Sequence, residues 1–306
     1  MPTVVFTGVT SFLGRNLAKK LLENGYKVYA LIRENSANIN NLPNDKEFIK
    51  IYGSLQNMDA IKETVDIADI FIHFAWDGSG NEGRANVEIQ QRNVEYAKKA
   101  MSIAKDLSCK MFLFPGSQAE YGSKFDEIFE DDECIPLSPY GKAKLEFSKW
   151  AMEETKNTQL QFIHLRIFSV YGYGDRKGTL IDSCVCKMNQ GGIIHLGPCM
   201  QQWNYLYISD FVKIIIRLLE NNCVTGIYNI ASKDTRMLRE FVEEIYACSN
   251  KKGEFEFDGK ATNPEGSPNL IPNVDKMLRI IGEIQFTRFD EGIKEIMEKI
   301  PKEAES

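Results

Sequence analysis

Histidine is scarce in this chain of 306 residues, which contains only His73, His164 and His195. These three stand far apart in the sequence, and Cys184 and Cys186 have no partner pair at a spacing that suits zinc. The sequence therefore predicts no metal site.

The seven cysteines are scattered and odd in number, unlike the framework of a disulfide-rich secreted protein. The N-terminus leads from Met1 and Pro2 into a strand-like apolar run, without the features of a signal peptide. No apolar run reaches the ~20 residues of a membrane span. The formal net charge of −6 at pH 7 argues against nucleic-acid binding. We therefore expect a cytoplasmic protein with reduced thiols and no membrane or nucleic-acid partner.

What the chain does have is an ordinary globular composition, with 43% hydrophobic and 26% charged residues, and a regular alternation of elements. Strands are expected at residues 3–7, 27–32, 48–52, 70–74, 110–114, 161–167 and 226–230, and helices at residues 12–23, 86–106, 140–154, 209–220 and 290–299. Apolar strands that alternate with helices predict an α/β fold with a parallel sheet covered on both faces. The acidic segment 127–133 is expected to be a solvated loop.

The first strand and the first helix are joined by T-G-V-T-S-F-L-G, which places Gly8, Ser11 and Gly14 at intervals of three. Glycine directly after a strand permits a tight turn, and small residues let backbone N–H groups approach a pyrophosphate at the helix N-terminus. A dinucleotide-binding turn requires this context. The sequence thus predicts a Rossmann-type, doubly wound, mainly parallel sheet in residues 1–172 plus 207–232. Residues 173–206 plus 233–306 are expected to form a smaller C-terminal substrate-binding lobe.

The end of the second strand indicates which dinucleotide binds. NAD-binding units of this kind usually carry an acidic residue there, which holds the ribose 2′-hydroxyl. Ile32 occupies that position, and Arg33, which suits a 2′-phosphate, follows it. NADP(H) is therefore the favoured cofactor. NAD(H) stays the alternative, because Glu34 could turn toward the ribose.

Tyr140 and Lys144 stand one helical turn apart in the segment S-P-Y-G-K-A-K. A phenol with a pKa of ~10 holds its proton too tightly to exchange it readily near pH 7. An ammonium group one turn away favours the phenolate. Such a pair suits a reaction in which a ketone accepts a hydride and its oxygen needs a proton.

Further patterns lie in order around this pair. They are His73-Phe74-Ala75 at a strand end, Asn93-Val94 in a helix, Ser117 four residues before Tyr121-Gly122, Arg166 before Tyr171-Gly172, and Tyr207-Ile208-Ser209-Asp210. With these motifs, over roughly residues 3–232, the chain resembles the extended short-chain dehydrogenase/reductase superfamily, also called the NAD-dependent epimerase/dehydratase family.

The resemblance implies a role for each residue of the site. Tyr140 would be the proton donor, and Lys144 would favour the phenolate and hold the nicotinamide ribose. Ser117 would donate to the carbonyl oxygen, and Asn93 would place a water that relays protons to Lys144. The resemblance further implies cofactor contacts from Gly8, Thr10, Ser11, Phe12, Leu13, Gly14, Arg33, Ser54, Leu55, Phe74, Ala75, Trp76, Tyr140, Lys144 and Phe168.

The residues after Ser117 favour some reactions of this family over others. Dehydratases usually carry an acidic pair where this chain has Gln118 and Ala119, so dehydration is not expected. Together with Arg33, this favours a 4-ketoreductase that acts on a nucleotide-activated deoxy sugar. The alternatives are a nucleotide-sugar 4-epimerase with bound NAD, an NADPH reductase of a small non-sugar ketone, and an NADP-sensing protein without turnover.

The substrate side departs from the family pattern. Trp203 stands where an arginine often grips the diphosphate, Ser267 lies where a second arginine is usual, and Ser169 replaces a frequent asparagine. The candidate substrate residues are Gln118, Ser169, Trp203, Arg84 and Arg176, and Lys177 and Arg236 are further spare cations.

Two helices carry apolar residues that suggest assembly. Tyr96 and Met101 lie on the helix at 86–106, and Phe147 and Trp150 lie on the helix at 140–154, on faces with few polar residues. In the family that the chain resembles, the matching helices pair across a two-fold axis as a four-helix bundle. A homodimer is therefore expected.

Overall fold

A seven-stranded sheet forms the centre of the computed structural model, which describes residues 1–221, 224–259 and 269–300. The strand order is β11-β7-β5-β4-β1-β2-β3, and every neighbouring pair is parallel. The strands are β1 (Thr3–Thr7), β2 (Lys27–Ile32), β3 (Phe48–Tyr52), β4 (Ile70–His73), β5 (Met111–Ser117), β7 (Gln161–Ile167) and β11 (Gly226–Ile230). This is the predicted doubly wound Rossmann architecture.

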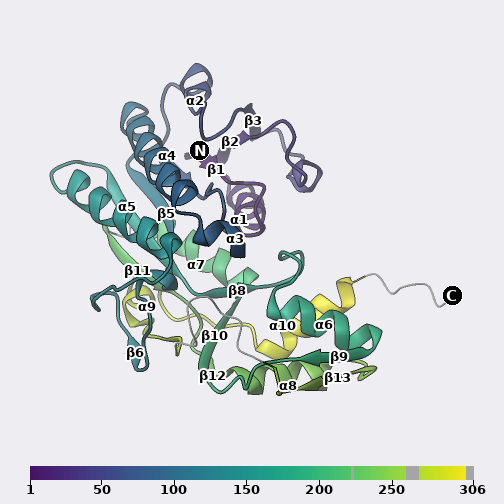
Figure 1. Cartoon of the computed structure of the whole chain (residues 1–306). Helices are drawn as coiled ribbons and strands as arrows, with labels where there is room; N and C mark the ends of the chain where they lie inside the picture. The colour runs from purple at the N-terminus through teal and green to yellow at the C-terminus, as the bar shows by residue number, and fades with distance from the viewer. Residues whose placement is uncertain (222–223, 260–268, 301–306) are drawn as a thin grey trace.

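Helices cover both faces of this sheet, as Figure 1 shows. On one face lie α2 (Ala60–Thr64), α4 (Val87–Asp106) and α5 (Pro139–Thr155), and on the other lie α1 (Phe12–Glu23) and α7 (Ile208–Glu220). Phe71 and Phe112 pack under α4 and α5, whereas Phe6 packs with Leu17 and Phe211 on the opposite face. Since both faces are buried, the strands are apolar throughout rather than alternating.

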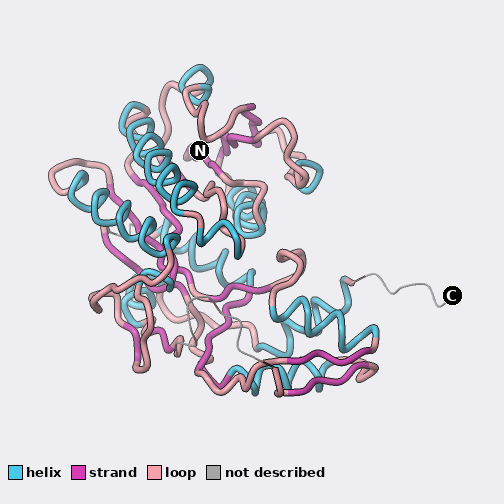
Figure 2. The backbone as a smooth tube through the Cα atoms, in the orientation of Figure 1, coloured by secondary structure: helices cyan, strands magenta, loops and turns pink. Residues whose placement is uncertain are grey.

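The remaining elements lie mainly at the carboxyl ends of the strands (Figures 1 and 2). Three short strands form one sheet: β8 (Ser169–Tyr171), β10 (Gln202–Tyr207) and β12 (Thr235–Met237). Beyond it, β9 (Gly192–His195) pairs with β13 (Gly253–Glu256), and α6 (Leu180–Gln190), α8 (Leu238–Cys248) and α10 (Phe289–Lys299) pack around this pair. The remaining described elements are α3 (Asn81–Ala85), α9 (Asp275–Ile281), β6 (Glu127–Ile128), β14 (Ile271–Pro272), and the short 3-10 helices η1 (Ile39–Asn41) and η2 (Gln118–Glu120). The division into two units at the expected boundaries stays a prediction.

Two sequence expectations need correction. The fifth strand does not end at residue 114 but continues to Ser117, because Pro115, Gly116 and Ser117 stay in register with β7. The acidic segment 127–133 is not simply a solvated loop. Ile128 is buried, β6 pairs with β14, and Glu130 accepts a hydrogen bond from the backbone N–H of Asn229.

Two further expectations concern assembly and compartment. Met101 and Phe147 are fully buried within one chain, so they cannot contribute to a dimer interface, whereas Tyr96 and Trp150 are half-buried. The six cysteines in the described part of the chain have free thiols, and Cys223 lies outside it. None of the described helices has the length and apolar character needed to cross a bilayer.

Candidate active site

The glycine turn after β1 is shaped by close backbone contact. Gly8 has a φ of +82°, and a Cβ there would come within 2.3 Å of the backbone nitrogen of Ala75 after β4. Ser11 caps α1, since its Oγ accepts a hydrogen bond of 3.0 Å from the Gly14 N–H. The Ser11 hydroxyl keeps its own proton to donate, so this serine is compatible with an anion-binding helix N-terminus.

A single cavity of about 2290 Å³ runs from this turn across the carboxyl ends of the strands. Its volume exceeds the ~300–1,000 Å³ of a typical small-ligand pocket, which leaves room for a dinucleotide and a second ligand. All the predicted catalytic, cofactor and substrate residues line this cavity except Gly14 and Asn93. Gly14 instead packs against the carbonyl oxygen of Gly8, where a Cβ would not fit.

Tyr140 lies in the first turn of α5, on the wall of the cavity. Ser138 caps the helix by accepting the Gly141 N–H at 3.2 Å, and Pro139 stands at the first helical position, where its missing N–H is not needed. A Cβ at Gly141 would meet the Ala119 carbonyl oxygen at 2.5 Å, so glycine lets α5 approach the segment after β5. The capping turn thus lets the first turn of α5, which carries Tyr140, pack against η2, the segment that follows Ser117.

Lys144 is almost completely buried, with 2% of its surface exposed. Its Nζ donates a hydrogen bond of 2.8 Å to the Pro115 carbonyl and lies 3.7 Å from the ring centroid of Trp76 and 4.5 Å from that of Phe114. Burial lowers the pKa of Lys144 well below its ordinary value, while the negative charge of Glu120 opposes that shift. The aromatic rings stabilise the ammonium in this dry setting.

Ser117 stands at the last position of β5 and is buried. Its hydroxyl donates to the Gln118 side-chain oxygen at 2.5 Å and accepts the Ala119 N–H at 3.2 Å. To donate to a substrate oxygen, this hydroxyl must turn away from Gln118. In the structure, the Ser117 proton is therefore already used in a hydrogen bond to Gln118.

Asn93 is held on the backbone of Asp77. Its side-chain oxygen accepts the Asp77 N–H at 2.9 Å, and its amide donates to the Asp77 carbonyl at 2.8 Å. These two hydrogen bonds fix the position of the segment after β4, where Asp77 lines the cavity. The predicted water relay from Asn93 to Lys144 stays a prediction.

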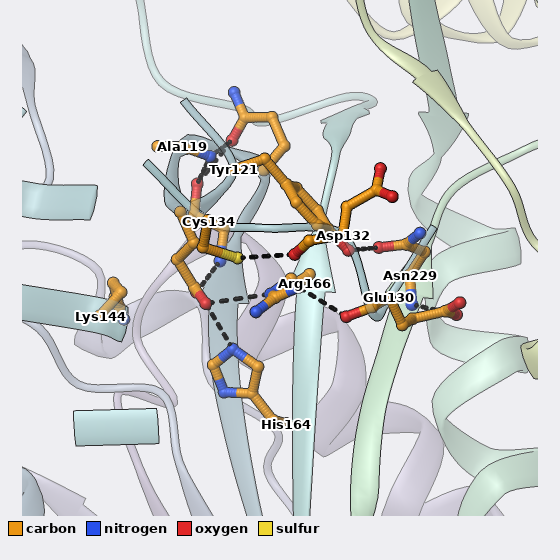
Figure 3. A network of polar contacts seen from close by, with 12 residues as sticks. Ala119, Tyr121, Glu130, Asp132, Cys134, Lys144, His164, Arg166 and Asn229 are labelled. Carbon is orange, nitrogen blue, oxygen red and sulfur yellow. Dashed lines mark hydrogen bonds and ion pairs between the residues drawn. The ribbon is translucent and has the colours of Figure 1, made fainter. Parts of the chain in front are cut away.

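The carboxylate of Glu120 is fully buried next to Ser117, and Figure 3 labels two of its partners, His164 and Arg166. Glu120 accepts the Ser117 N–H at 2.8 Å, His164 Nε2 at 2.8 Å and Arg166 Nε at 3.1 Å. Burial alone would raise the pKa of Glu120, but the charges and hydrogen bonds of these partners hold it below its ordinary value. Because an ionised carboxylate only accepts, the imidazole carries its proton on Nε2. His164 Nδ1 is then a bare, buried acceptor without a partner among the described residues.

The sequence did not identify Glu120 as a site residue. Its partners lie 44 and 46 residues away in the chain, and no spacing rule links them. A signal was nevertheless present: an acidic residue stands three positions after Ser117, just beyond the end of an apolar strand. A buried carboxylate at such a position needs paired cations or donors to offset its desolvation.

The end of the cavity beside β2, where adenosine is expected, carries a cation. Arg33 and Ser36 line it, together with Ile32, Asn38 and Ser54, whereas Glu34 does not. Asn38 fastens this loop to the glycine turn by donating to the Thr10 carbonyl at 3.3 Å.

The residues predicted to contact substrate also line the cavity, as does Lys177; they are Gln118, Ser169, Trp203, Arg84 and Arg176. The Trp203 Nε1 is buried and has no hydrogen-bond partner among the described residues. Arg176 donates to the Ser79 carbonyl at 3.3 Å. The remaining candidate cation, Arg236, does not line the cavity and forms ion pairs with Asp234 and Glu244. Ser267 lies outside the described residues.

One histidine, His195, lies in a cluster of residues that could in principle hold a metal ion. His195, Glu256 and Asp258 bring their ligand atoms within 4.8 Å of one another, and all three are exposed. The His195 Nδ1 lies 2.9 Å from Asp258 and 3.5 Å from Glu256, so the group is accounted for as surface ion pairs. His73 is buried and lies 2.8 Å from the Thr7 hydroxyl, which ties β4 to β1.

Comparison with known proteins places these features in a family. The model of the NAD dependent epimerase/dehydratase family matches residues 4–231. A dTDP-4-dehydro-6-deoxyglucose reductase of Escherichia coli is 26% identical over 97% of each chain. An uncharacterized UDP-glucose epimerase of Bacillus subtilis (strain 168) is 24% identical over 95% of each.

The fold agrees with these matches. A solved structure of a UDP-N-acetylglucosamine 4-epimerase from Methanobrevibacter ruminantium M1 in complex with UDP-N-acetylmuramic acid superposes with a TM-score of 0.84, at 21% identity and over 97% of each chain. The glycine turn, the Tyr140–Lys144 pair and the family model that covers most of the sequence lead to one conclusion: the chain belongs to the NAD dependent epimerase/dehydratase family.

Proposed function

We propose that the protein reduces the 4-keto group of a nucleotide-activated deoxy sugar with NADPH. The observation that carries this proposal is the meeting of Tyr140, Lys144 and Ser117 in one cavity with the glycine turn. The Escherichia coli relative supports it, because its name describes the reduction of a 4-dehydro sugar and the match covers nearly both whole chains.

The chain's own residues support a simple proton and charge balance. The bound nicotinamide would supply the hydride to the carbonyl carbon. Ser117 donates to the carbonyl oxygen while negative charge grows there, and Tyr140 transfers its phenolic proton to the same oxygen. The phenolate that remains is stabilised by the cations beside its ring. Lys144, whose Nζ lies 5.6 Å from the Tyr140 ring centroid, would then return a proton to it.

Elimination of water from the sugar fits this site poorly. Gln118 and Ala119 follow Ser117, and neither can act as an acid or base. Glu120 is the next residue, but its carboxylate is fully buried and already accepts three hydrogen bonds. Reversible hydride transfer without elimination therefore remains.

A nucleotide-sugar 4-epimerase with bound NAD is the second candidate. It would use the same phenol and lysine, and the Bacillus subtilis relative carries an epimerase name. An NADPH reductase of a small non-sugar ketone is a third, favoured by Trp203 in place of a cation at the substrate end. Net consumption of the cofactor separates the first two: a reductase oxidises one NADPH for each nucleotide sugar reduced, whereas an epimerase interconverts sugars without net oxidation.

We expect the protein to bind NADPH at least ~10-fold more tightly than NADH, a difference of about 1.4 kcal/mol. Arg33 lines the adenosine end and can contact a 2′-phosphate through several donors, whereas Glu34 does not line the cavity. Arg33→Ala should erase most of the preference and leave NADH binding nearly unchanged, as measured by titration calorimetry.

Glu34→Gln is the matched control for that measurement. If Glu34 held the ribose hydroxyls, this variant would lose NADH affinity. A wild-type preference for NADH, or equal loss of both cofactors in Arg33→Ala, would refute NADPH use and move the epimerase to first place.

We also propose a homodimer through α4 and α5, which contact each other on one face of the sheet. Tyr96 and Trp150 are half-buried there, and their remaining apolar surface suits a second copy. Sedimentation at micromolar concentration should give twice the mass of 34.9 kDa. Trp150→Glu should shift it toward monomer, and a strictly monomeric wild type would disprove the proposal.

A further inference from the structure

Two cations from two different helices face the ring of Tyr140. The Arg84 guanidinium carbon lies 4.3 Å from the ring centroid, and the Lys144 Nζ lies 5.6 Å from it. Arg84 comes from α3 and Lys144 from α5, the helix of Tyr140 itself. The sequence indicates no relation between Arg84 and Tyr140, because 56 residues separate them.

The two cations differ in how firmly they hold their charge. Lys144 is buried among aromatic rings, which lowers its pKa well below the ordinary value, and the nearby Arg84 lowers it further. An arginine does not lose its proton in proteins, and its guanidinium is less costly to desolvate than an ammonium. Lys144 is thus suited to exchanging a proton, and Arg84 to supplying a constant charge.

The segment that carries Arg84 is fixed by buried amides of α4. Gln90 donates to the carbonyls of Gly78 and Gly83 at 3.1 and 2.8 Å, and Asn93 holds both backbone groups of Asp77. A Cβ at Gly83 would lie 2.3 Å from the Gly78 Cα, so the segment closes tightly on itself. The short helix α3 therefore holds Arg84 in a fixed place beside the phenol.

We propose that the Arg84 guanidinium is a second, permanently charged partner of the Tyr140 phenol, which stabilises its phenolate form while Lys144 gains and loses a proton. A cation attracts the electron-rich face of a neutral ring, and it attracts the charged phenolate more strongly. Arg84 is thus a positioning residue that acts through Tyr140. The inference rests on the proposed function only in making Tyr140 the proton donor.

Other charged and titratable groups around the pair come from several elements. They are Glu120 of η2, His73 of β4, His164 of β7, Asp77 of the segment after β4, and Arg176 of the segment after β8. Burial lowers the pKa of His73 to about 3 and also lowers that of His164, so both are neutral near pH 7. Glu120 is already neutralised by its own partners. The two histidines therefore add no charge near the phenol, and the charge of Glu120 is offset by His164 and Arg166.

The pH profile of the oxidising direction tests this inference. That direction needs the phenolate, so kcat/KM rises with pH through the apparent pKa of the Tyr140–Lys144 pair. Arg84→Gln should shift the midpoint of this rise to a pH about one unit higher. On the acid side of the midpoint kcat/KM should then be about tenfold lower, and on the high-pH plateau it should change little. Arg84→Lys, which keeps a charge, should restore most of the wild-type profile.

Arg92 on α4 provides the control, because it is exposed and does not line the cavity. Arg92→Gln removes one charge and should leave the midpoint of the pH profile unchanged. A second readout needs no substrate. The tyrosinate absorbance of the protein minus that of its Tyr140→Phe variant reports the Tyr140 phenol alone, and Arg84→Gln should raise its titration midpoint by the same unit. This keeps the test separate from the proposed function, because the phenol titrates whether or not any sugar turns over.

Two outcomes would overturn the inference. In the first, Arg84→Gln leaves both the midpoint of the pH profile and the phenol titration in place but raises KM at every pH, which would make Arg84 a binder of a substrate anion. In the second, Arg84→Lys fails to restore the midpoint although Arg84→Gln moves it, which would indicate a change of shape rather than of charge.

Discussion

Tyr140→Phe should lower kcat/KM for ketone reduction by about 100-fold or more while the fold stays intact. Proton transfer by a positioned side chain contributes typically 10²–10⁴-fold, and phenylalanine keeps the ring but has no proton to give. Tyr140 is only half-buried, so the loss of its hydroxyl should change the unfolding midpoint little. Steady-state NADPH oxidation and thermal unfolding measure the two effects.

Tyr246→Phe is the matched control, because Tyr246 lies on α8, packs on Phe255 and does not line the cavity. Its activity should equal that of the wild type. If Tyr140→Phe kept more than about a tenth of the wild-type kcat/KM, another group would have to supply the proton and the mechanism proposed for Tyr140 would be wrong.

Glu120→Ala should lower the free energy of unfolding by about 3–5 kcal/mol, the usual cost of removing one member of a buried ion pair. The change leaves the Ser117 N–H, His164 Nε2 and the buried Arg166 charge without their common acceptor. Denaturant unfolding at pH 7 measures the loss. Because the pKa of Glu120 is lowered in the fold, its stabilising effect is present at pH 7 and is lost as the pH falls through that lowered pKa.

Glu133→Ala controls for the loss of one negative charge, since Glu133 is exposed and a surface substitution usually changes stability by less than ~0.5 kcal/mol. Glu120→Gln should fall between the two, because the amide keeps one acceptor for Ser117 but loses the charge that pairs with Arg166. A loss below about 1 kcal/mol in Glu120→Ala would show that the network is not a stabilising element.

Much of the sheet was predictable because local signals agree with the tertiary fold. Strands β1, β2, β3, β7 and β11 match the expected ranges, since each is an apolar run bounded by turn residues. The glycine turn and the Tyr140–Lys144 pair were also predictable, because each is a short pattern whose chemistry depends on neighbours within one turn.

The charge environment of the site could not be predicted in the same way. The pairing of Glu120 with His164 and the stacking of Arg84 on Tyr140 join distant segments, and only the packing of η2 on β7 and of α3 on α5 brings them together. Periodicity reports which face of an element is buried, but not which charge of another element it meets. The same limit explains why Met101 and Phe147 suggested an interface although both are fully buried in the core.

The most direct test of the proposed ketone reduction measures the transfer of deuterium from the cofactor to the sugar. The protein is given NADPH that carries deuterium at nicotinamide C4, on one face and then on the other, together with nucleotide-activated 4-keto-6-deoxy sugars, and the sugar product is examined by mass spectrometry and NMR. The account predicts that deuterium from one face appears at C4 of the sugar, with one NADPH oxidised per product, and that Tyr140→Phe nearly abolishes the transfer. Sugars recovered without deuterium while both labelled cofactors remain intact would contradict it.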